Sequence, residues 1–182
     1  MKHILFTISV CFIFLSGCKK ENNTQPIEPK NAGSSKITTE LIINSGVGFS
    51  FGYGTTIVIA NPNNIKPDMI LLVQRSAHGE ILGVFLSSID LTPMFSLIEE
   101  FNNLDSAKKA FDEFKEVPAN LTFVELAIPA KKNQVWAVKT LDDKYAKILI
   151  TNTLVNYDST KPDYYGEADF DWVYQPNGSN KF

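Results

Sequence analysis

The residues whose chemistry is easiest to recognise stand at the N-terminus. The basic head Met1–His3 precedes an uncharged stretch, residues 4–15, and the small residues Ser16 and Gly17 follow before Cys18. The stretch is shorter than the roughly 20 apolar residues that a membrane-spanning helix needs. A basic head, a short apolar stretch and a small-residue exit are typical of an export signal. The sequence therefore predicts that residues 1–17 are a removable signal peptide.

The exit sequence Leu15-Ser16-Gly17-Cys18 resembles the lipobox of bacterial lipoproteins. The resemblance implies diacylation of the Cys18 sulfur, cleavage before Cys18 and, often, acylation of the new amine. Because two or more acyl chains give stable residence on a membrane, we expect the mature chain to be held at a membrane surface. The residue after the cysteine is Lys19 and not Asp, which favours sorting to the outer membrane by analogy with enterobacterial lipoproteins. The start of the mature chain, Cys-Lys-Lys-Glu-Asn-Asn, also resembles lipoproteins of the Bacteroidetes. The periplasmic and cell-surface faces both stay open.

The composition of the mature chain, 18–182, argues against several functions. Without Lys2, 16 basic side chains remain against 20 acidic ones, a net charge near −4, which gives no basic surface for nucleic acid. Cys11 leaves with the signal, so the lipidated Cys18 is the only cysteine. Disulfides, cysteine nucleophiles and cysteine-containing metal sites are therefore excluded.

Residues 18–36 are polar, with two prolines, a Gly-Ser-Ser run and Ile27 as the only large apolar residue. This composition predicts a disordered tether between the lipid and the folded part. Residues 37–182 then form one globular domain, which is long enough to bury a core without disulfides.

The domain is predicted to be α+β, with about eight mostly antiparallel strands in a sandwich or an open barrel-like sheet. Alternating or apolar runs predict the strands, which are 37–43, 46–59, 69–75, 80–87, 121–128, 134–140, 145–153 and 164–175. The last run is the clearest, with aromatic and small residues on one face and acidic residues on the other. Turn residues stand at Ser76–Gly79, at Asp142–Asp143 and after Gln175.

A two-helix insertion is predicted at about 92–117. Thr92-Pro93 supplies an N-cap and a first-turn proline, and Phe95, Ile98 and Phe101 follow near helical spacing. A second helix fits residues 106–116 and should end at Val117-Pro118, because the residue before proline avoids the helical region.

A serine nucleophile is the first catalytic hypothesis, because Gly48-Phe-Ser-Phe-Gly52 matches the G-x-S-x-G pattern of hydrolases. That chemistry needs a strand–turn–helix corner, whereas the alternation here runs on to Ile59 and places Ser50 within a strand.

A phosphate-binding role for the same glycines needs a helix N-terminus, and a strand follows instead. His78 is the only histidine of the mature chain and falls in a predicted turn. We interpret it as an exposed turn residue in preference to a general base or a metal ligand.

Carboxylates on the last strand raise a metal hypothesis. Glu167, Asp169 and Asp171 alternate along one face, and carboxylates suit calcium. The preceding loop adds the oxygen donors Asn156, Asp158 and Asp163. Ligands spaced by two on a strand splay along the surface, so we favour a solvated acidic face over a metal site. A glycosidase-type carboxylate pair stays open because it depends on separation in space.

Aromatic residues of the strands could line a ligand pocket or stack on a sugar. The candidates are Phe49, Phe51, Tyr53, Trp136, Phe170, Trp172 and Tyr174. Aromatics that alternate on strand faces more often form the core, and we favour the core for most of them.

Four C-terminal pieces carry a further resemblance. They are Val135–Thr140, Asp143–Ile148, Tyr164–Glu167 and Phe170–Gly178. These strand-and-turn patterns resemble the C-terminal part of HmuY-like lipoproteins of the Bacteroidetes. The resemblance implies a β-rich outer-membrane lipoprotein that captures haem and passes it to a transporter.

The haem site of that group does not transfer to this chain. Haem ligation there uses two histidines, and the mature chain has only His78, which excludes two-histidine ligation within one chain. Met69 and Met94 could act as axial ligands instead, but both fit buried positions better. No cofactor is therefore predicted, and only location and β-rich character are carried over.

Together these observations predict a lipid-anchored, non-catalytic binding module of the bacterial envelope, which holds a small ligand, a glycan or an outer-membrane transporter. A structural or assembly-associated envelope subunit without a small ligand is the alternative, and a hydrolase is the third. An open aromatic pocket opposite the glycine-rich strand would favour the binding module, whereas a fully packed interior would favour the structural subunit.

Overall fold

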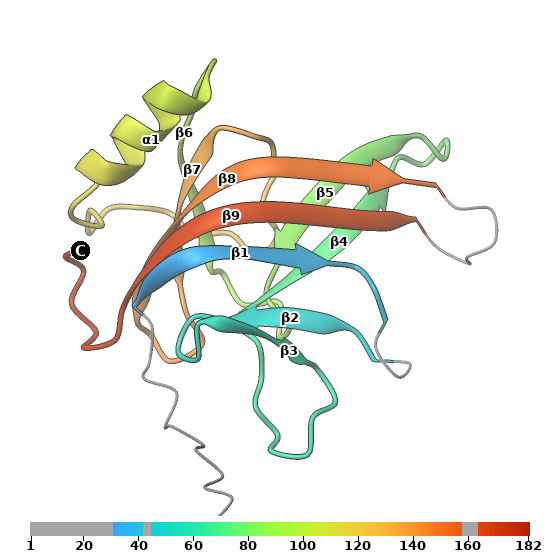
Figure 1. Cartoon of the computed structure of the whole chain (residues 1–182), viewed down its shortest axis with the longest axis horizontal. Coiled ribbons are helices and arrows are strands. Elements are labelled where there is room, and N and C mark those ends of the chain that lie inside the picture. Colours follow the sequence, from blue (N-terminus) through green and yellow to red (C-terminus); the bar gives the residue numbers. More distant parts are fainter. Residues whose placement is uncertain (1–30, 42–44, 158–163) are drawn as a thin grey trace, which may run out of the picture.

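The computed structural model describes residues 31–41, 45–157 and 164–182, which form two antiparallel sheets packed face to face (Figure 1). The first sheet has the order β1 (Ala32–Thr38), β9 (Tyr165–Gln175), β8 (Tyr145–Asn156), β7 (Gln134–Lys139) and β6 (Phe95–Glu100). The second has the order β3 (Thr55–Val58), β2 (Val47–Ser50), β4 (Met69–Arg75) and β5 (Ile81–Ser87). The expected sheet-rich, antiparallel fold is confirmed. The signal peptide, Cys18, Asp158 and Asp163 lie outside the described residues.

The prediction of a two-helix insertion is wrong, because residues 95–100 form the strand β6. A register shift between Leu97 and Glu99 explains the misleading spacing. Before the shift, Phe95 and Leu97 face the core between the sheets. After it, Ile98 and Phe101 pack on the opposite face. A bulged strand thus mimics the apolar spacing of a helix.

The second predicted helix exists as α1 (Leu104–Glu113), the only helix of the described ranges. The Asn103 side chain caps it by accepting the Ser106 N–H at 2.9 Å. The helix ends before the expected residue 116 because the following residues bond the C-terminus instead. Val117 donates its N–H to the Asn180 carbonyl at 2.8 Å, and Phe182 donates to Lys115 at 2.8 Å.

The long strand expected over 46–59 is a hairpin, β2 and β3, with a turn at residues 51–54. Gly54 takes a φ of 60°, and its N–H donates to the Phe51 carbonyl at 3.2 Å. A four-residue turn leaves the odd–even alternation intact, so the period of two runs through it unnoticed. Phe51 is buried, whereas Tyr53 points outward with 55% of its surface exposed.

Two further differences from the expectation concern β1 and residues 121–128. β1 begins at Ala32, inside the stretch assigned to the tether, and pairs with β9 from Ala32↔Val173 to Thr38↔Glu167. Only Ile37 of this strand is buried, so β1 is held by its hydrogen bonds and not by an apolar pattern. The strand expected over 121–128 forms isolated bridges at Val124 and Leu126.

The core lies between the sheets and is rich in aromatic side chains. The predicted alternation of β9 is confirmed, since Phe170, Trp172 and Tyr174 are buried along one face. Phe49 meets Phe170 and Trp172 edge-on, with ring centroids 5.1 and 5.4 Å apart. Such pairs add about 0.5–1.5 kcal/mol each beyond burial. On the outer face of the first sheet, α1 packs against β7 and β8.

Candidate functional site

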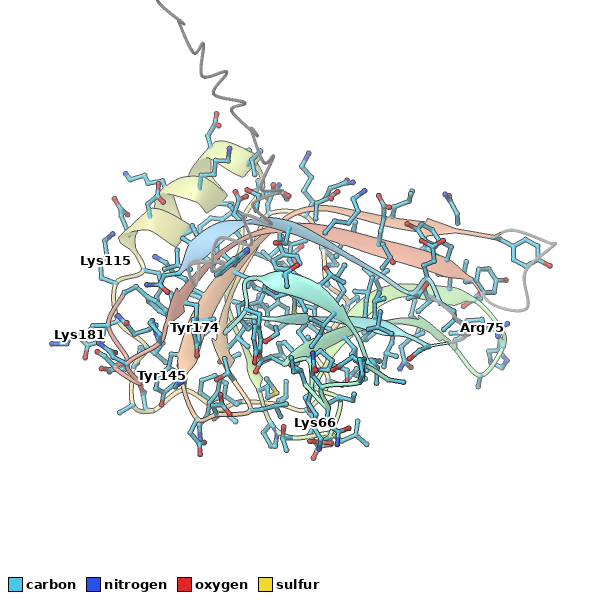
Figure 2. The ribbon with its side chains drawn as sticks, turned by 60° about the horizontal axis from the view of Figure 1, so that its bottom comes forward. Lys66, Arg75, Lys115, Tyr145, Tyr174 and Lys181 are labelled. Carbon is cyan, nitrogen blue, oxygen red and sulfur yellow. The ribbon has the colours of Figure 1, made fainter. Side chains whose placement is uncertain are left out.

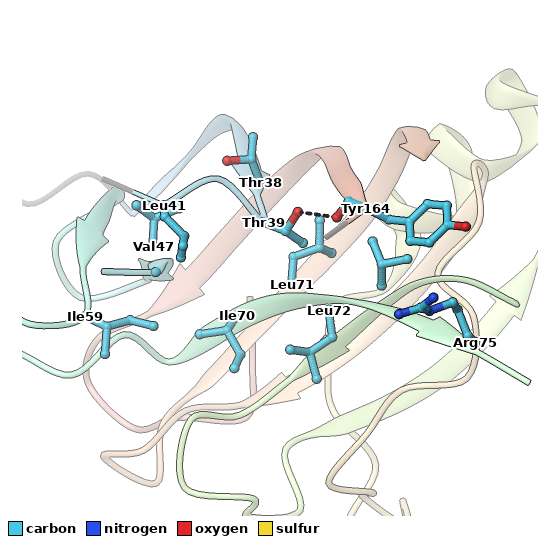
Figure 3. A pocket seen from close by; sticks show the side chains of 12 residues that line it. Thr38, Thr39, Leu41, Val47, Ile59, Ile70, Leu71, Leu72, Arg75 and Tyr164 are labelled. Carbon is cyan, nitrogen blue, oxygen red and sulfur yellow. Dashed lines mark hydrogen bonds between the residues drawn. The ribbon is translucent and has the colours of Figure 1, made fainter. Parts of the chain in front are cut away.

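The candidate binding site is a cavity at the end of the sandwich where β1 finishes, and we call it the edge slot (Figure 3). It has a volume of about 310 Å³, within the range of small-molecule pockets. Its lining is mostly aliphatic and comprises Thr38, Thr39, Leu41, Gly46, Val47, Ile59, Ile70, Leu71, Leu72, Val73, Arg75 and Tyr164.

The edge slot arises because β2 and β4 separate after a short contact. β2 pairs with β4 only at Phe49↔Met69 and Gly48↔Ile70. The rest of β4, Leu71–Arg75, pairs with β5 on its other side. Within the described parts of the chain, no strand is paired with this length of β4 on the β2 side. Among the described residues, the slot therefore exposes an open sheet edge.

The wall opposite β4 is held by hydrogen bonds around Thr39. Its backbone N–H donates to the Gly166 carbonyl at 2.9 Å, and its hydroxyl oxygen accepts the Gly166 N–H at 2.9 Å. The same hydroxyl donates to the Tyr164 carbonyl at 3.4 Å. A Cβ on Gly166 would lie 2.7 Å from the Val73 side chain, so glycine here allows the two sheets to approach. Hydrogen bonds and close packing between the sheets therefore hold the Thr39–Gly166 wall of the slot in place.

Arg75 is the only arginine of the chain, and it lies at one end of the edge slot. Its guanidinium carbon lies 5.0 Å from the centroid of the Tyr164 ring, which is a cation–π contact. Figure 3 shows this pair at one end and Ile59 at the other. None of the ion pairs among the described residues includes Arg75. The slot is thus lined mainly by aliphatic side chains and has a cation at one end.

Arg75, and with it the slot, lies far from the cations Lys115 and Lys181. Figure 2 shows Arg75 at the opposite end of the molecule from Lys115 and Lys181. β1 runs from Ala32 to Thr38, and the slot lies at the Thr38 end. The chain thus enters the first sheet at the end away from the slot.

A second cavity, of about 340 Å³, surrounds Asp68 and Tyr174 and includes the exposed Tyr53. The Asp68 carboxylate is buried and accepts the N–H groups of Phe51 at 2.9 Å and Leu141 at 3.1 Å. Burial raises the pKa of Asp68 above its ordinary value, against these two hydrogen bonds. Since both carboxylate oxygens already hold backbone groups, Asp68 has a structural role.

The predicted catalytic residues are not brought together. Ser50 ends β2, is buried, and precedes a turn and a strand, not the helix of a nucleophile elbow. The turn predicted at Ser76–Gly79 is confirmed by the Ser76 N–H, which donates to the Glu80 carbonyl at 2.8 Å. His78 is exposed in that turn, beyond the end of β4 that is remote from β2.

The predicted acidic residues lie on the outer face of β9 as alternation required, and each has a partner there. Lys36 of β1 forms ion pairs with Glu167 at 2.8 Å and Asp169 at 3.5 Å. Ser34 donates a hydrogen bond to Asp171. The Lys36 ammonium is the main cause that holds the pKa of Glu167 below its usual value. Among the described residues, no group of three or more His, Cys, Asp or Glu side chains is arranged to hold a metal ion.

Most aromatic candidates do not face a ligand. Phe49, Phe51, Trp136 and Trp172 are at least 98% buried in the core, as favoured from the sequence. Of the aromatic candidates, Tyr53 and Tyr174 border the second cavity. Met69 and Met94 are buried as favoured from the sequence. The sequence reasoning missed Arg75, whose uniqueness in the chain was the one available signal.

Comparison of the chain with known protein families, with curated proteins and with solved structures gives no match. In the described ranges, no helix has the length and apolar character of a membrane span.

Proposed function

We propose that this chain is a lipid-anchored, non-catalytic binding module of the bacterial outer membrane, with the edge slot as its binding site. The anchor is Cys18, on the strength of the sequence Leu15-Ser16-Gly17-Cys18. The observation that carries the binding function is a largely aliphatic slot of about 310 Å³ that ends in Arg75, which forms no ion pair with another described residue. Pockets with aliphatic walls and a single charged group are typical of ligand sites.

The orientation of the slot supports the proposal. The tether would join the first sheet at Ala32, whereas the slot lies at the other end of β1. A module attached through Cys18 would therefore present the slot away from its point of attachment. The two-sheet architecture also suits the β-rich lipoproteins that the HmuY-like resemblance implies, without their two-histidine haem site.

The packed interior favours one other candidate, a structural or assembly-associated envelope subunit. The aromatic side chains that would have lined a central pocket fill the core instead. This candidate would need no small ligand, and the edge slot would then have no occupant.

Lipid attachment is tested with Cys18→Ala, expressed as the full chain in a bacterial host fed a clickable fatty acid. We expect the wild type to incorporate the label and to partition with membranes, and Cys18→Ala to lose both. Cys11→Ala is the matched control, because that cysteine lies outside the lipobox and should leave labelling unchanged. Labelling of Cys18→Ala at the wild-type level would contradict the anchor.

Binding is tested on the mature chain, residues 18–182, by thermal shift against haem, calcium, an oligosaccharide panel and short peptides. A ligand that raises the melting temperature, and whose effect is reduced by Arg75→Gln, supports the binding module. Absence of a shift with every ligand, together with cross-linking to envelope proteins in cells, would favour the structural subunit.

A further inference from the structure

We propose that the edge slot binds an extended peptide segment of a partner protein, which adds as a strand to the open edge of β4. The inference rests on the binding-module function proposed above and names the class of its partner. In this mode of recognition, main-chain hydrogen bonds give affinity and side-chain pockets give specificity.

The order of the lining residues shows which part of β4 faces the slot. A sheet face presents every second residue of a strand. Here the consecutive residues Ile70, Leu71, Leu72 and Val73 all line the cavity, so the slot views the strand from its edge. Backbone N–H and C=O groups of β4 therefore point into the slot between two rows of aliphatic side chains.

The aliphatic walls of the slot would suit either an acyl chain or an extended peptide. The backbone groups of β4 distinguish between these two occupants. An acyl chain would cover the edge of β4 without bonding it, and each buried polar group left unpaired costs about 1–3 kcal/mol. An extended peptide pairs with the same groups and places its own apolar side chains against Leu71 and Val73. The slot therefore favours a peptide over a purely aliphatic ligand.

Two of the outer sheet edges, those of β5 and β6, are covered by residues 124–130. Ala127 and Ala130 donate their N–H groups to the carbonyls of Leu86 and Val84 in β5, at 2.9 and 2.8 Å. Val124 exchanges backbone hydrogen bonds with Phe95 of β6. Proteins commonly cover their sheet edges to prevent unwanted pairing, so an edge left open inside a shaped slot fits a site for a specific strand.

Arg75 sets the charge and the direction of the peptide. Every strand pairing in the two sheets is antiparallel, and a peptide that continues β2 would also run antiparallel to β4. Its N-terminal residue would then lie beside Arg75 and its C-terminal residue beside Leu71. An acidic residue at the N-terminal end of the peptide would pair with the guanidinium, which among the described residues has only the Tyr164 ring.

The test uses the ¹⁵N-labelled mature chain, residues 18–182, and the probe peptide acetyl-Asp-Thr-Val-Thr-Val-amide with variants at its valines. We expect amide resonances of Leu71–Arg75 and Thr39 to shift with the peptide at millimolar concentration. A backbone N-methylated peptide of the same sequence should lose binding, because it keeps the side chains but lacks the donors. Moving the Asp to the C-terminal end should weaken binding.

Matched variants separate the charge from general effects. Arg75→Gln should weaken binding of the probe about fivefold, as expected for a partly exposed ion pair, and this loss should shrink at high salt. Lys66→Gln removes an exposed cation elsewhere on the surface and should leave binding unchanged. Equal effects of the two variants would overturn the role of Arg75.

Three results would overturn the peptide assignment. The first is equal binding of the N-methylated probe, and the second is absence of shifts at Leu71–Arg75 with every peptide of the panel. The third is a concentration-dependent dimer that perturbs the same amides, since it would assign the edge to a second copy of this chain. If dodecanoate or an oligosaccharide shifts these amides while the peptides do not, the binding module stands and the peptide inference fails.

Discussion

The Asp68 carboxylate accepts a hydrogen bond from the Leu141 N–H at 3.1 Å, although the two residues are 73 positions apart in the sequence. Asp68 directly precedes β4 in one sheet, and Leu141 follows β7 in the other. The second carboxylate oxygen accepts the Phe51 N–H at 2.9 Å, in the turn between β2 and β3. One buried side chain thus joins two turns and both sheets.

Replacement of Asp68 should strongly destabilise the fold. Asp68→Ala leaves two N–H groups without their acceptor, and we expect a loss of about 2–5 kcal/mol in the free energy of unfolding. Asp68→Asn keeps one acceptor oxygen and should lose about half as much. Urea unfolding followed by the fluorescence of the buried Trp136 and Trp172 measures both. Asp90→Ala, which removes only an exposed pair with Lys66, should cost less than about 1 kcal/mol; a similar loss there would contradict the assigned role.

Lys147 of β8 holds the end of α1. Its ammonium donates to the carbonyls of Phe111 at 2.6 Å and Phe114 at 2.8 Å, and it lies over the Phe111 ring at 4.7 Å. The side chain therefore satisfies carbonyls that the last turn of a helix leaves unpaired. A cation at this position also complements the helix dipole.

Removal of the ammonium should release the end of the helix. Lys147→Met keeps the apolar stem but leaves both carbonyls buried without donors, and we expect a loss of about 2–4 kcal/mol. Hydrogen exchange should rise first in the last turn of α1. Lys108→Met on the exposed face of the same helix is the matched control and should change stability by less than about 0.5 kcal/mol. Equal losses in the two variants would rule out the capping role.

Lys147 also predicts a dependence of stability on pH. Burial, reinforced by Lys115, lowers the pKa of Lys147 to about 8 in the folded chain from its ordinary 10.5. Between these values the unfolded chain binds the proton more tightly than the folded chain, so stability should rise with pH across this window. The difference between wild type and Lys147→Met isolates the effect from other titrating groups. A difference that stays constant from pH 7 to pH 10 would contradict the lowered pKa.

The parts of the fold that the sequence predicts are those in which side-chain alternation alone sets the structure. β4 begins and ends where expected, and β9 differs at one end only, because each strand has one face in the core. The alternation fails where a bulge or a turn changes the backbone without changing the pattern. The shift between Leu97 and Glu99 and the turn at residues 51–54 are two examples.

The edge slot has no local signature in the sequence. It depends on how far β2 stays paired with β4, and on Tyr164 returning from the far end of the chain to contact Arg75. Both relationships join residues that are distant in sequence, so neither periodicity nor composition reports them.

The acidic face of β9 was predicted because Glu167, Asp169 and Asp171 share one strand. Their partner Lys36 was not predicted, because it lies in the stretch 18–36 that was interpreted as a disordered tether.

Gly48 tests the link between the packing of β2 and the shape of the slot. A Cβ at this position would lie 2.4 Å from the Pro67 Cβ and 2.8 Å from the Met69 carbonyl oxygen. Gly48→Ala should therefore push β2 from β4 at the point where the two strands separate. We expect a loss of about 1–3 kcal/mol in the free energy of unfolding and shifts of the amide resonances along Leu71–Arg75.

Gly52→Ala is the matched control, because its new Cβ would meet only the Tyr174 hydroxyl, at 3.9 Å. Its free energy of unfolding and its β4 amide resonances should stay near those of the wild type. Wild-type stability and unshifted β4 amides in Gly48→Ala would show that this close contact does not define the slot.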